Sequence, residues 1–540
     1  MRIANLDHLG IVAGIIDRIG LVQRVNERLG TSPDELISSG QVLKAMILNG
    51  LGFVSAPMYL FSRFFEGKPT EHLLGEGVRP ELLNDDKIAR VLEKLFDAGL
   101  TSLFVEIALE AAQCEGIGTD RLHLDATSFS VHGRYPPQEA EGQNQEEEEP
   151  KPIHITYGYS RDRRPDLKQF LVDLMVSGEG GVPLFFRASD GNESDAAMFA
   201  ELIRDYQAHS DFEALFVADA ALYNEENLKR LGTKMKYVSR VPETIERAKD
   251  LLQAVDEELA FSDAEPEGYR VAEVEASYAG LKQRWVVVES DKRAQRGIEQ
   301  VERRVGHERT KATKALRDLG RRPFNCERDA REAVKKLAKG LHHHRLENIT
   351  IEPEPYHAQP GRPRKDAVPA GYRYRVAAEL VRDEAEVARR KRRAGRFLLA
   401  TNVLEAGALP AGEVLETYLG QQVVERGFRF LKDPLFFTSS VFLKTPKRVA
   451  ALAMVMGLCL LVYSLGEREV RLKLAENDAS IPDQKGRPTR RPTLRWVFQS
   501  FQAVHLVIAG ANKLVHGLTE ERKHILMFFS PECRRYYLLT

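Results

Sequence analysis

The order of strand-like and helix-like segments between residues 121 and 241 constrains the fold more than any other feature of the sequence. β-Branched and aromatic residues are concentrated there in short runs, as is typical of strands. Three consecutive strands followed by alternating helices and strands predict a mixed α/β sheet with helices packed on it. The predicted segments are strand 123–133, strand 169–176, strand 182–188, helix 194–206, strand 214–218, helix 224–231 and strand 236–241.

Length and charge restrict the class of protein. A chain of 540 residues is too long for one ordinary core, so two to four domains are expected. Hydrophobic residues make up 43% and charged residues 29%, as in a soluble globular protein, and the formal net charge is −1. A global positive field is therefore excluded, and any binding to nucleic acid must rely on local basic patches.

The four cysteines lie far apart and form no CxxC pair. This spacing argues against a disulfide scaffold and a structural zinc site, and it favours the cytosol. Arg2, Asp7 and His8 interrupt the apolar run that a signal peptide would need. The apolar segment 449–465 is marginal for a membrane span, which needs about 20 residues, so we expect a buried core helix and no membrane.

The N-terminal part predicts an all-helical domain that binds DNA, dimerises or does both. Ile11, Ile15 and Ile19 follow helical spacing, residues 32–35 predict a capped helix start, and a further helix is expected over 86–100. The expected domains are 1–118 (all-helical), 119–243 (first part of the sheet core), 244–396 (insertion), 397–470 (second part of the core) and 471–540 (basic and helical).

The insertion is expected to combine strands with a charged helical pair. Its predicted strands cover 269–275 and 284–289, and its helices cover 293–319 and 327–341. Residues 397–401 predict a strand that leads back to the core. The expected architecture is thus a multidomain α/β protein with a helical N-terminal domain and a β-rich and helical insertion.

Three carboxylates are candidates for metal ligands. Asp125 lies on the first predicted strand, Asp219 ends the fourth, and Glu425 lies on a predicted helix. In a ribonuclease-H-like mixed sheet, which has this strand order, the first and fourth strands are neighbours, so both aspartates are expected at one edge. Taken singly, such an Asp is usually a turn or cap residue and such a Glu is usually solvated. Together they supply the hard oxygen ligands that two Mg²⁺ or Mn²⁺ ions, about 3.5–4 Å apart, need in phosphodiester chemistry.

The spacing around Glu425 strengthens that interpretation. Tyr418, Gln421, Glu425 and Lys432 follow the pattern Y-x2-Q-x3-E-x6-K. On one continuous helix all four would point into a sector of roughly 60°. Such a polar stripe is not a core face, and it predicts a helix that lines a site for metal and phosphate. Pro434 is expected to end this helix.

The segment resembles the Y-x2-R-x3-E-x6-K signature of one branch of bacterial insertion-sequence DDE transposases. HLDATSFSVHG around Asp125, YGYSRDRRPDLKQ in the second strand region and FVADAALYNEENL around Asp219 are similar to that branch as well. The resemblance covers about 120–245 and 395–465. It implies a ribonuclease-H-like catalytic core with an insertion between the second Asp and the Glu.

The resemblance also implies roles for residues and partners. Asp125, Asp219 and Glu425 would hold the two metal ions, while Tyr418 and Lys432 would contact phosphate. The enzyme would cleave its own terminal inverted repeats and join them to target DNA, often through a hairpin intermediate, as a dimer on DNA at the bacterial nucleoid. Gln421 departs from the Arg of the signature, so its phosphate contact should be weaker. Arg426 and Arg429 are conjectured to supply the missing charge.

Three basic segments are further candidates for DNA contacts. Arg362, Arg364 and Lys365 stand in a Gly/Pro-rich linker similar to the core of an AT-hook. The other candidates are Arg389, Arg390, Lys391, Arg392 and Arg393 in one run and Arg487, Arg490 and Arg491 in another. Each segment also has the simpler interpretation of a solvated basic surface.

Other conspicuous residues have weaker functional interpretations. His342 to His344 are expected to be a polar helix end rather than a metal tract. His123 would share a strand face with Asp125 and is a candidate neighbour of the site. Trp285 and Trp496 are expected in cores, although a tryptophan in an insertion domain can stack on a displaced base.

Two other functions remain possible from the sequence. A metal-dependent nuclease or resolvase of the same fold would use the same carboxylates without joining DNA ends. A transposase-derived protein could bind DNA without catalysis. Inverted repeats flanking the coding DNA would favour a transposase over both.

Overall fold

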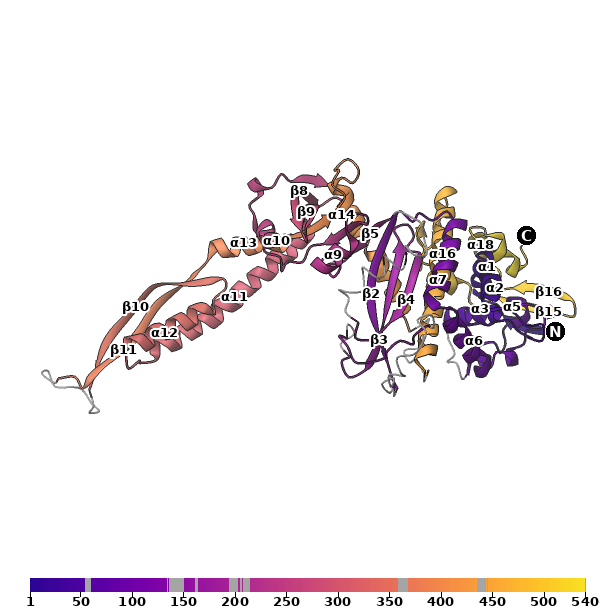
Figure 1. Cartoon of the computed structure of the whole chain (residues 1–540), viewed down its shortest axis with the longest axis horizontal. Helices are drawn as coiled ribbons and strands as arrows, with labels where there is room; N and C mark the ends of the chain where they lie inside the picture. Colours follow the sequence, from indigo (N-terminus) through magenta and orange to yellow (C-terminus); the bar gives the residue numbers. More distant parts are fainter. Residues whose placement is uncertain are drawn as a thin grey trace. The chain divides into compact units, whose positions relative to one another are not determined.

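The computed structural model describes residues 1–53, 60–133, 135, 150–160, 164–193, 203, 206, 214–357, 368–434, 443 and 445–539. It divides into two compact units. The first comprises residues 1–239, 278–281 and 417–540, and the second comprises residues 240–277 and 282–416. Figure 1 shows the elements of both units.

A mixed sheet organises the first unit. Its strands follow the order β4-β3-β2-β5-β6. β2, β3 and β4 pair antiparallel, whereas β5 runs parallel to both β2 and β6. This is the mixed α/β sheet that the sequence predicts. The strands are β2 (Arg121–Val131), β3 (Lys168–Ser177), β4 (Pro183–Ser189), β5 (Leu215–Ala218) and β6 (Lys236–Arg240).

The helices between the later strands are only partly described. α9 (Glu225–Leu231) begins where Asn224 accepts a hydrogen bond from the backbone of Asn227, as an N-cap residue does. The helix predicted over 194–206 lies almost wholly outside the described residues.

The long apolar helix α16 (Pro446–Glu476) forms the core of the first unit. Its most apolar window has a mean hydropathy of 2.2, which by length and composition would suit a membrane span, yet 89% of that window is buried in the protein. The expectation of a buried core helix is therefore confirmed. α16 packs against β4 on one side and against the N-terminal helices α1, α3, α6 and α7.

The N-terminal helices make up the part for which the sequence predicts a separate domain, residues 1–118. They share α16 with the sheet and belong to the same compact unit. These helices are α1 (Leu9–Arg18), α2 (Leu21–Leu29), α3 (Ser39–Gly50), α4 (Phe61–Phe64), α5 (Thr70–Leu74), α6 (Asp85–Asp97) and α7 (Leu100–Cys114).

Two details of this region differ from the sequence prediction. The helix start expected at residues 32–35 occurs at Ser38, whose side chain caps α3 in a reciprocal pair with Gln41. The region is also not wholly helical, because β1 (Arg2–Asn5) pairs with β15 (His505–Ala509). Near the C-terminus, β15 pairs with β16 (Asn512–His516). The remaining elements there are β13 (Ile481–Pro482), β14 (Pro488–Thr489), α17 (Leu494–Ser500), α18 (Glu520–Leu526) and α19 (Pro531–Arg534).

The second unit contains strands in the order β12-β9-β8-β7 and helix α10 (Glu246–Gln253). β12, which begins at the boundary expected at residue 396, pairs along its length with β9. Buried Arg284 on β9 also donates to the carbonyls of Val403 and Leu409 and so ties the following segment to this unit. The strands are β7 (Ser262–Ala264), β8 (Tyr269–Tyr278), β9 (Leu281–Ser290) and β12 (Arg396–Thr401).

A long hairpin and two helices within the second unit form what we call the arm. It consists of α11 (Asp291–Arg321), α12 (Glu327–Lys339), β10 (His344–Tyr356) and β11 (Gly371–Arg382) (Figure 1). Phe324, Ala330, Val334 and Val376 make its small core. The helical pair agrees with the sequence prediction, whereas the hairpin was not predicted. α13 (Glu384–Gly395) follows β11 and packs on α11 through Val301, Val305 and Val387.

Candidate active site

The two candidate aspartates belong to adjacent parallel strands: Asp125 lies on β2 and Asp219 directly follows β5. The register of β2 and β5 pairs His123 with Val217, and Asp125 and Asp219 each follow two residues later. Both side chains are half-buried. Asp125 accepts a hydrogen bond of 2.8 Å from the backbone N–H of Ala126, and Asp219 accepts one of 2.9 Å from that of Ala221. The carboxyl end of β5 therefore presents both aspartates at one place on the sheet.

Glu425 lies on a separate short helix. We expected one helix to carry the whole Y-x2-Q-x3-E-x6-K motif, but the chain forms α14 (Ala411–Leu419) and α15 (Gln422–Leu431) instead. A Cβ atom on Gly420 would stand 2.8 Å from Cε1 of His123, closer than real Cβ contacts allow. The absence of a side chain at Gly420 thus lets the chain approach β2 where the two helices meet.

The side chain of Gln421 hydrogen-bonds to residues of the sheet. The sequence analysis expected this side chain to contact phosphate instead. Its Nε2 donates to the carbonyl oxygen of Leu124 at 2.6 Å, and its Oε1 lies 3.3 Å from Nδ1 of His123. Burial lowers the pKa of His123 to about 4, although the hydrogen bond to Gln421 opposes the shift. The imidazole is therefore neutral at pH 7, and Nδ1 donates to the amide oxygen. Gln421 consequently fixes the start of α15 on β2.

Two contacts show the course of α15 over the sheet. A Cβ atom on Gly427 would lie 3.1 Å from Leu174, the residue that pairs with Asp125 across β2 and β3. Nζ of Lys432 lies 5.4 Å from the ring centroid of Phe129, near the end of β2. α15 therefore runs along β2, the strand that carries Asp125. Glu425 lies in the first turn of α15, and its side chain is exposed.

The chemical character of these carboxylates fits hard divalent cations, since Mg²⁺ and Mn²⁺ prefer oxygen ligands. The geometry brings Asp125 and Asp219 together, while Glu425 stands on the neighbouring helix. Among the described residues, no three His, Cys, Asp or Glu side chains lie close enough together to hold one ion. The sharing of a metal pair by all three residues stays a prediction.

The other residues of the expected phosphate site are dispersed around α15. Half-buried Tyr418 lies on α14, Arg429 is exposed on α15, and Lys432 is the residue that follows the last turn of α15. Arg426 points into a different feature, a groove of about 790 Å³ between the β3–β4 turn, α15, α16 and residues 490–491. We call this feature the arginine groove.

The arginine groove carries more positive charge than its acids neutralise. Arg468 pairs with Glu179 and Arg471 pairs with Glu467, each at 2.7 Å. Arg426 and Arg491, by contrast, form no ion pair with any residue that the structure describes. Burial lowers the pKa of Arg471, Glu467 opposes this shift, and the charges of Arg426 and Arg491 lower the pKa further. The groove is therefore suited to an anion.

Sequence analysis found Arg426, Arg490 and Arg491 as separate candidates but missed Arg468 and Arg471. These two follow the apolar part of α16 at a spacing of three residues, which places them on one helix face. That change from an apolar to a basic face was the available signal. Arg490 lines the groove as well, and it pairs with Asp478 at 2.5 Å.

Each cation of the basic run at 389–393 has a hydrogen-bond or ion-pair partner within the second unit. It lies in α13, where Arg389 and Arg390 both pair with Glu386. Lys391 pairs with Glu302, Arg393 pairs with Glu243, and Arg392 donates to the carbonyl of Gln253. Contact of this run with DNA stays a prediction, and it would require these cations to share or exchange their present partners.

The remaining candidates have mixed outcomes. Arg362, Arg364 and Lys365 lie outside the described residues. Arg487 stands in the turn between β13 and β14, where its backbone N–H donates to Asp483. Trp285 is buried in the second unit, as expected for a core tryptophan, and Trp496 is half-buried with its Nε1 donating to the carbonyl of Pro482. All four cysteines are free thiols.

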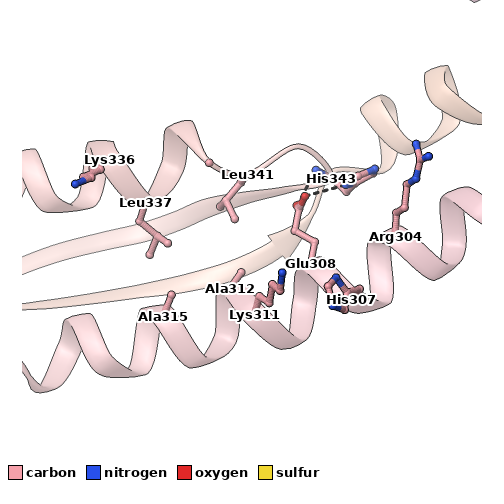
Figure 2. Close-up of a pocket in the computed structure, with 11 residues that line it drawn as sticks. Arg304, His307, Glu308, Lys311, Ala312, Ala315, Lys336, Leu337, Leu341 and His343 are labelled. Carbon is pink, nitrogen blue, oxygen red and sulfur yellow. Dashed lines mark hydrogen bonds and ion pairs between the residues drawn. The ribbon is translucent and has the colours of Figure 1, made fainter. Parts of the chain in front are cut away.

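The histidines at 342–344 bind a carboxylate rather than forming a metal tract. Glu308 accepts hydrogen bonds from the backbone of His342 and His343 and contacts Nδ1 of His344 at 3.1 Å. It also contacts Nδ1 of His343 at 2.9 Å (Figure 2). Burial alone would raise the pKa of Glu308, but the hydrogen bonds outweigh it and lower the pKa to about 2. Glu308 thus fastens the start of β10 to α11.

Comparison with known proteins agrees with this arrangement of the sheet. Residues 117–463, the stretch with the mixed sheet and both α14 and α15, match the family described as a transposase DDE domain. The chain belongs to this transposase family. Residues 1–109 match a family described as a domain of unknown function, DUF4277.

More distant comparisons add little. No curated protein matches the sequence. A cryo-EM structure described as a piggyBac transposase synaptic complex with hairpin DNA aligns with 93% of this chain and 83% of its own chain, at 9% identity and a TM-score of 0.37. A TM-score this low does not establish a common fold.

Proposed function

We propose that this protein cleaves the ends of an insertion sequence and joins them to target DNA, with Asp125, Asp219 and Glu425 as the ligands of two Mg²⁺ or Mn²⁺ ions. One observation carries the proposal: Asp125 and Asp219 each stand two residues beyond His123 and Val217, which are paired in the parallel register of β2 and β5. Glu425 on α15, which runs along β2, can complete the set by rotation of an exposed side chain.

The metal pair would polarise the scissile phosphate and activate the attacking hydroxyl. The chain's own residues prepare the place where this happens. Gln421 holds the first turn of α15 on β2, and His123 supports Gln421 as a neutral donor. The backbone N–H groups of Ala126 and Ala221 each donate to one carboxylate oxygen, of Asp125 and Asp219 respectively, and so orient the two side chains.

The DNA backbone is proposed to run along the arginine groove. Arg426 occupies the position after Glu425, so one helix carries both a metal ligand and a cation of the groove. Arg426 and Arg491 lack acidic partners in the described structure and are available for bidentate contacts with phosphate. The protein would act on its terminal repeats as a dimer in the cytoplasm.

The decisive experiment compares Asp219→Asn with Asp120→Asn. Asp120 is 77% exposed at the start of β2 and is not part of the site, so its variant is the matched control. Duplexes that carry the DNA flanking the coding region serve as substrate, with Mg²⁺, Mn²⁺ or EDTA. Asp219→Asn should lower cleavage at least about 100-fold, since even second-shell metal partners contribute 10–100-fold, while DNA binding persists.

The other outcomes separate the rival functions. Full cleavage by Asp219→Asn would remove Asp219 from the proposed ligand set. Cleavage without transfer of the cut strand to a target plasmid would favour a nuclease or resolvase. Binding without any cleavage by the wild type, in either metal, would favour a non-catalytic DNA-binding protein. Glu425→Gln, with Glu416→Gln on α14 as its control, tests the third ligand in the same way.

A further inference from the structure

The arm is much more basic than the chain as a whole. Between residues 291 and 339 there are 16 Lys and Arg against 8 Asp and Glu, whereas the whole chain has a net charge of −1. This excess of positive charge lies in the two helices α11 and α12. These helices pack against β10 and β11 through only a small apolar core. Stability of the arm does not require such charge, because like charges on one surface repel each other.

Four of these cations line one face of α11. Lys311, Lys314, Arg317 and Arg321 are all exposed, and at about 100° per residue they fall within a sector of about 120°. We call them the α11 stripe. The buried residues of α11, namely Val301, Val305 and Ala312, lie on the opposite side. The stripe therefore faces solvent rather than the core.

The stripe cations are not neutralised by neighbouring acids. None of the four has an ion pair within 4.0 Å among the described residues, although Asp318 lies between them in the sequence. On the same arm, acids at other positions are engaged: Glu327 pairs with Arg331 and Glu332 pairs with Lys335. The α11 stripe thus keeps its full charge for an external partner.

A groove of about 440 Å³ between α11 and α12 shows the same imbalance. Arg304, Lys311 and Lys336 border it, and Glu308 is the carboxylate among its lining residues (Figure 2). Figure 2 shows that the Glu308 carboxylate is directed to His343, with which it shares a hydrogen bond of 2.9 Å. Glu308 is therefore occupied by the start of β10, and none of the three cations has an ion pair with a residue that the structure describes.

We infer that the α11 stripe is a binding surface for the backbone of double-stranded DNA, independent of base sequence. A polyanion is the partner that an unpaired row of Lys and Arg fits. Single-stranded nucleic acid is bound by cations combined with aromatic stacking platforms, and residues 291–321 contain no Phe, Tyr or Trp. A straight 31-residue helix also matches a stiff duplex better than a flexible strand.

This inference depends on the proposed function in one respect, the choice of DNA as the natural polyanion. Binding of DNA by the α11 stripe does not require catalysis. The test uses the full chain in EDTA, so a failure of the metal chemistry leaves it unaffected. Conversely, a failure of the arm to bind leaves the cleavage experiment unaffected. The probes are a random-sequence duplex of about 30 base pairs and the matching single strand, titrated by fluorescence anisotropy at several salt concentrations.

The test variant changes all four stripe residues to Gln, a residue of similar helix propensity. The control variant changes four paired and exposed cations of the same arm to Gln: Arg331, Lys335, Arg345 and Arg375. Both variants lose four positive charges. Circular dichroism and thermal unfolding establish that both remain folded.

The stripe variant should bind the duplex roughly 100-fold or more weakly at about 100 mM salt, with a salt slope flatter by about three to four units. The control variant should stay within about threefold of the wild type. Equal losses in both variants would reduce the effect to bulk charge and overturn the assignment. Unchanged affinity and slope in the stripe variant, or tighter binding of the single strand than of the duplex, would overturn it as well.

Discussion

The basic run in α13 and the arginine groove differ in how far their cations are paired with other residues. The sequence alone suggests that the run in α13 is the more strongly charged region. In α13, five consecutive cations form the densest positive segment of the chain, yet Glu243, Glu302, Glu386 and the carbonyl of Gln253 accept from all of them. In the groove, Arg426, Arg471 and Arg491 are far apart in the sequence and meet with too few acids. Local density of charge is therefore a poor guide to an anion site, and the presence of cations without an ion-pair partner among the described residues is a better one.

The largest effect in this comparison is expected from the double substitution Arg426→Gln and Arg491→Gln. Two phosphate contacts would be lost, so affinity for end DNA should fall about 30- to 100-fold at moderate salt, and the salt slope should flatten by about two units. Anisotropy titrations measure both quantities. Arg389→Gln with Arg390→Gln removes the same charge from α13 and should change affinity less than about twofold. Equal losses from both pairs would remove the distinction between the regions.

An effect of intermediate size, on stability, is expected at Glu308, a carboxylate whose hydrogen-bond donors are histidine and backbone groups rather than Lys or Arg. Glu308→Gln should destabilise the arm by roughly 1–2 kcal/mol at pH 7, since it removes charge-assisted hydrogen bonds to the start of β10. The folded pKa of about 2 lies below the ordinary value of 4.5, so this stabilisation is complete above about pH 4.5 and is lost as the pH falls toward 2.

Hydrogen exchange of the α11 and α12 amides measures the local stability in question. The difference between wild type and Glu308→Gln should shrink when the pH is lowered from 6 to about 3. A constant difference across that range would show that the carboxylate charge does not hold the arm.

The smallest effect is expected from Glu302→Gln. Glu302 pairs with Lys391 and Arg382, and these hydrogen bonds lower its pKa. Without this carboxylate, both cations become available, so affinity for a random duplex should rise about threefold at low salt. Glu299→Gln, whose partner Arg303 is 4.0 Å away and already mostly exposed, is the control and should leave binding unchanged. A lower affinity of the Glu302 variant would contradict this prediction. It would mean that Lys391 and Arg382 contribute to DNA binding only while they are paired with Glu302.

The central sheet was predictable because its strands are largely buried and rich in β-branched and aromatic residues. β2, β3 and β5 were located within about two residues, and the expectation that the strands of Asp125 and Asp219 are neighbours follows from strand order. The helix α16 was recognisable from its apolar segment, 449–465. These are cases in which the local pattern and the tertiary environment agree.

Other elements depend on contacts that a local pattern does not contain. β1 pairs with β15, which lies about 500 residues later, and β10 is largely exposed with two prolines, so neither strand has a strong apolar alternation. The pairing of α13 with Glu243 and Glu302 is also non-local. The break at Gly420 arises from the ring of His123, nearly 300 residues earlier in the chain.

The break at Gly420 has a consequence for how the length of this segment can vary in evolution. Residues added to or removed from α14 before Gly420 change that helix alone, because Gln421 restarts the chain on the backbone of Leu124. A single residue inserted between Gln421 and Glu425 would instead rotate Glu425 by about 100° around α15. Natural length changes should therefore accumulate ahead of Gly420, while the four-residue step from Gln421 to Glu425 stays constant.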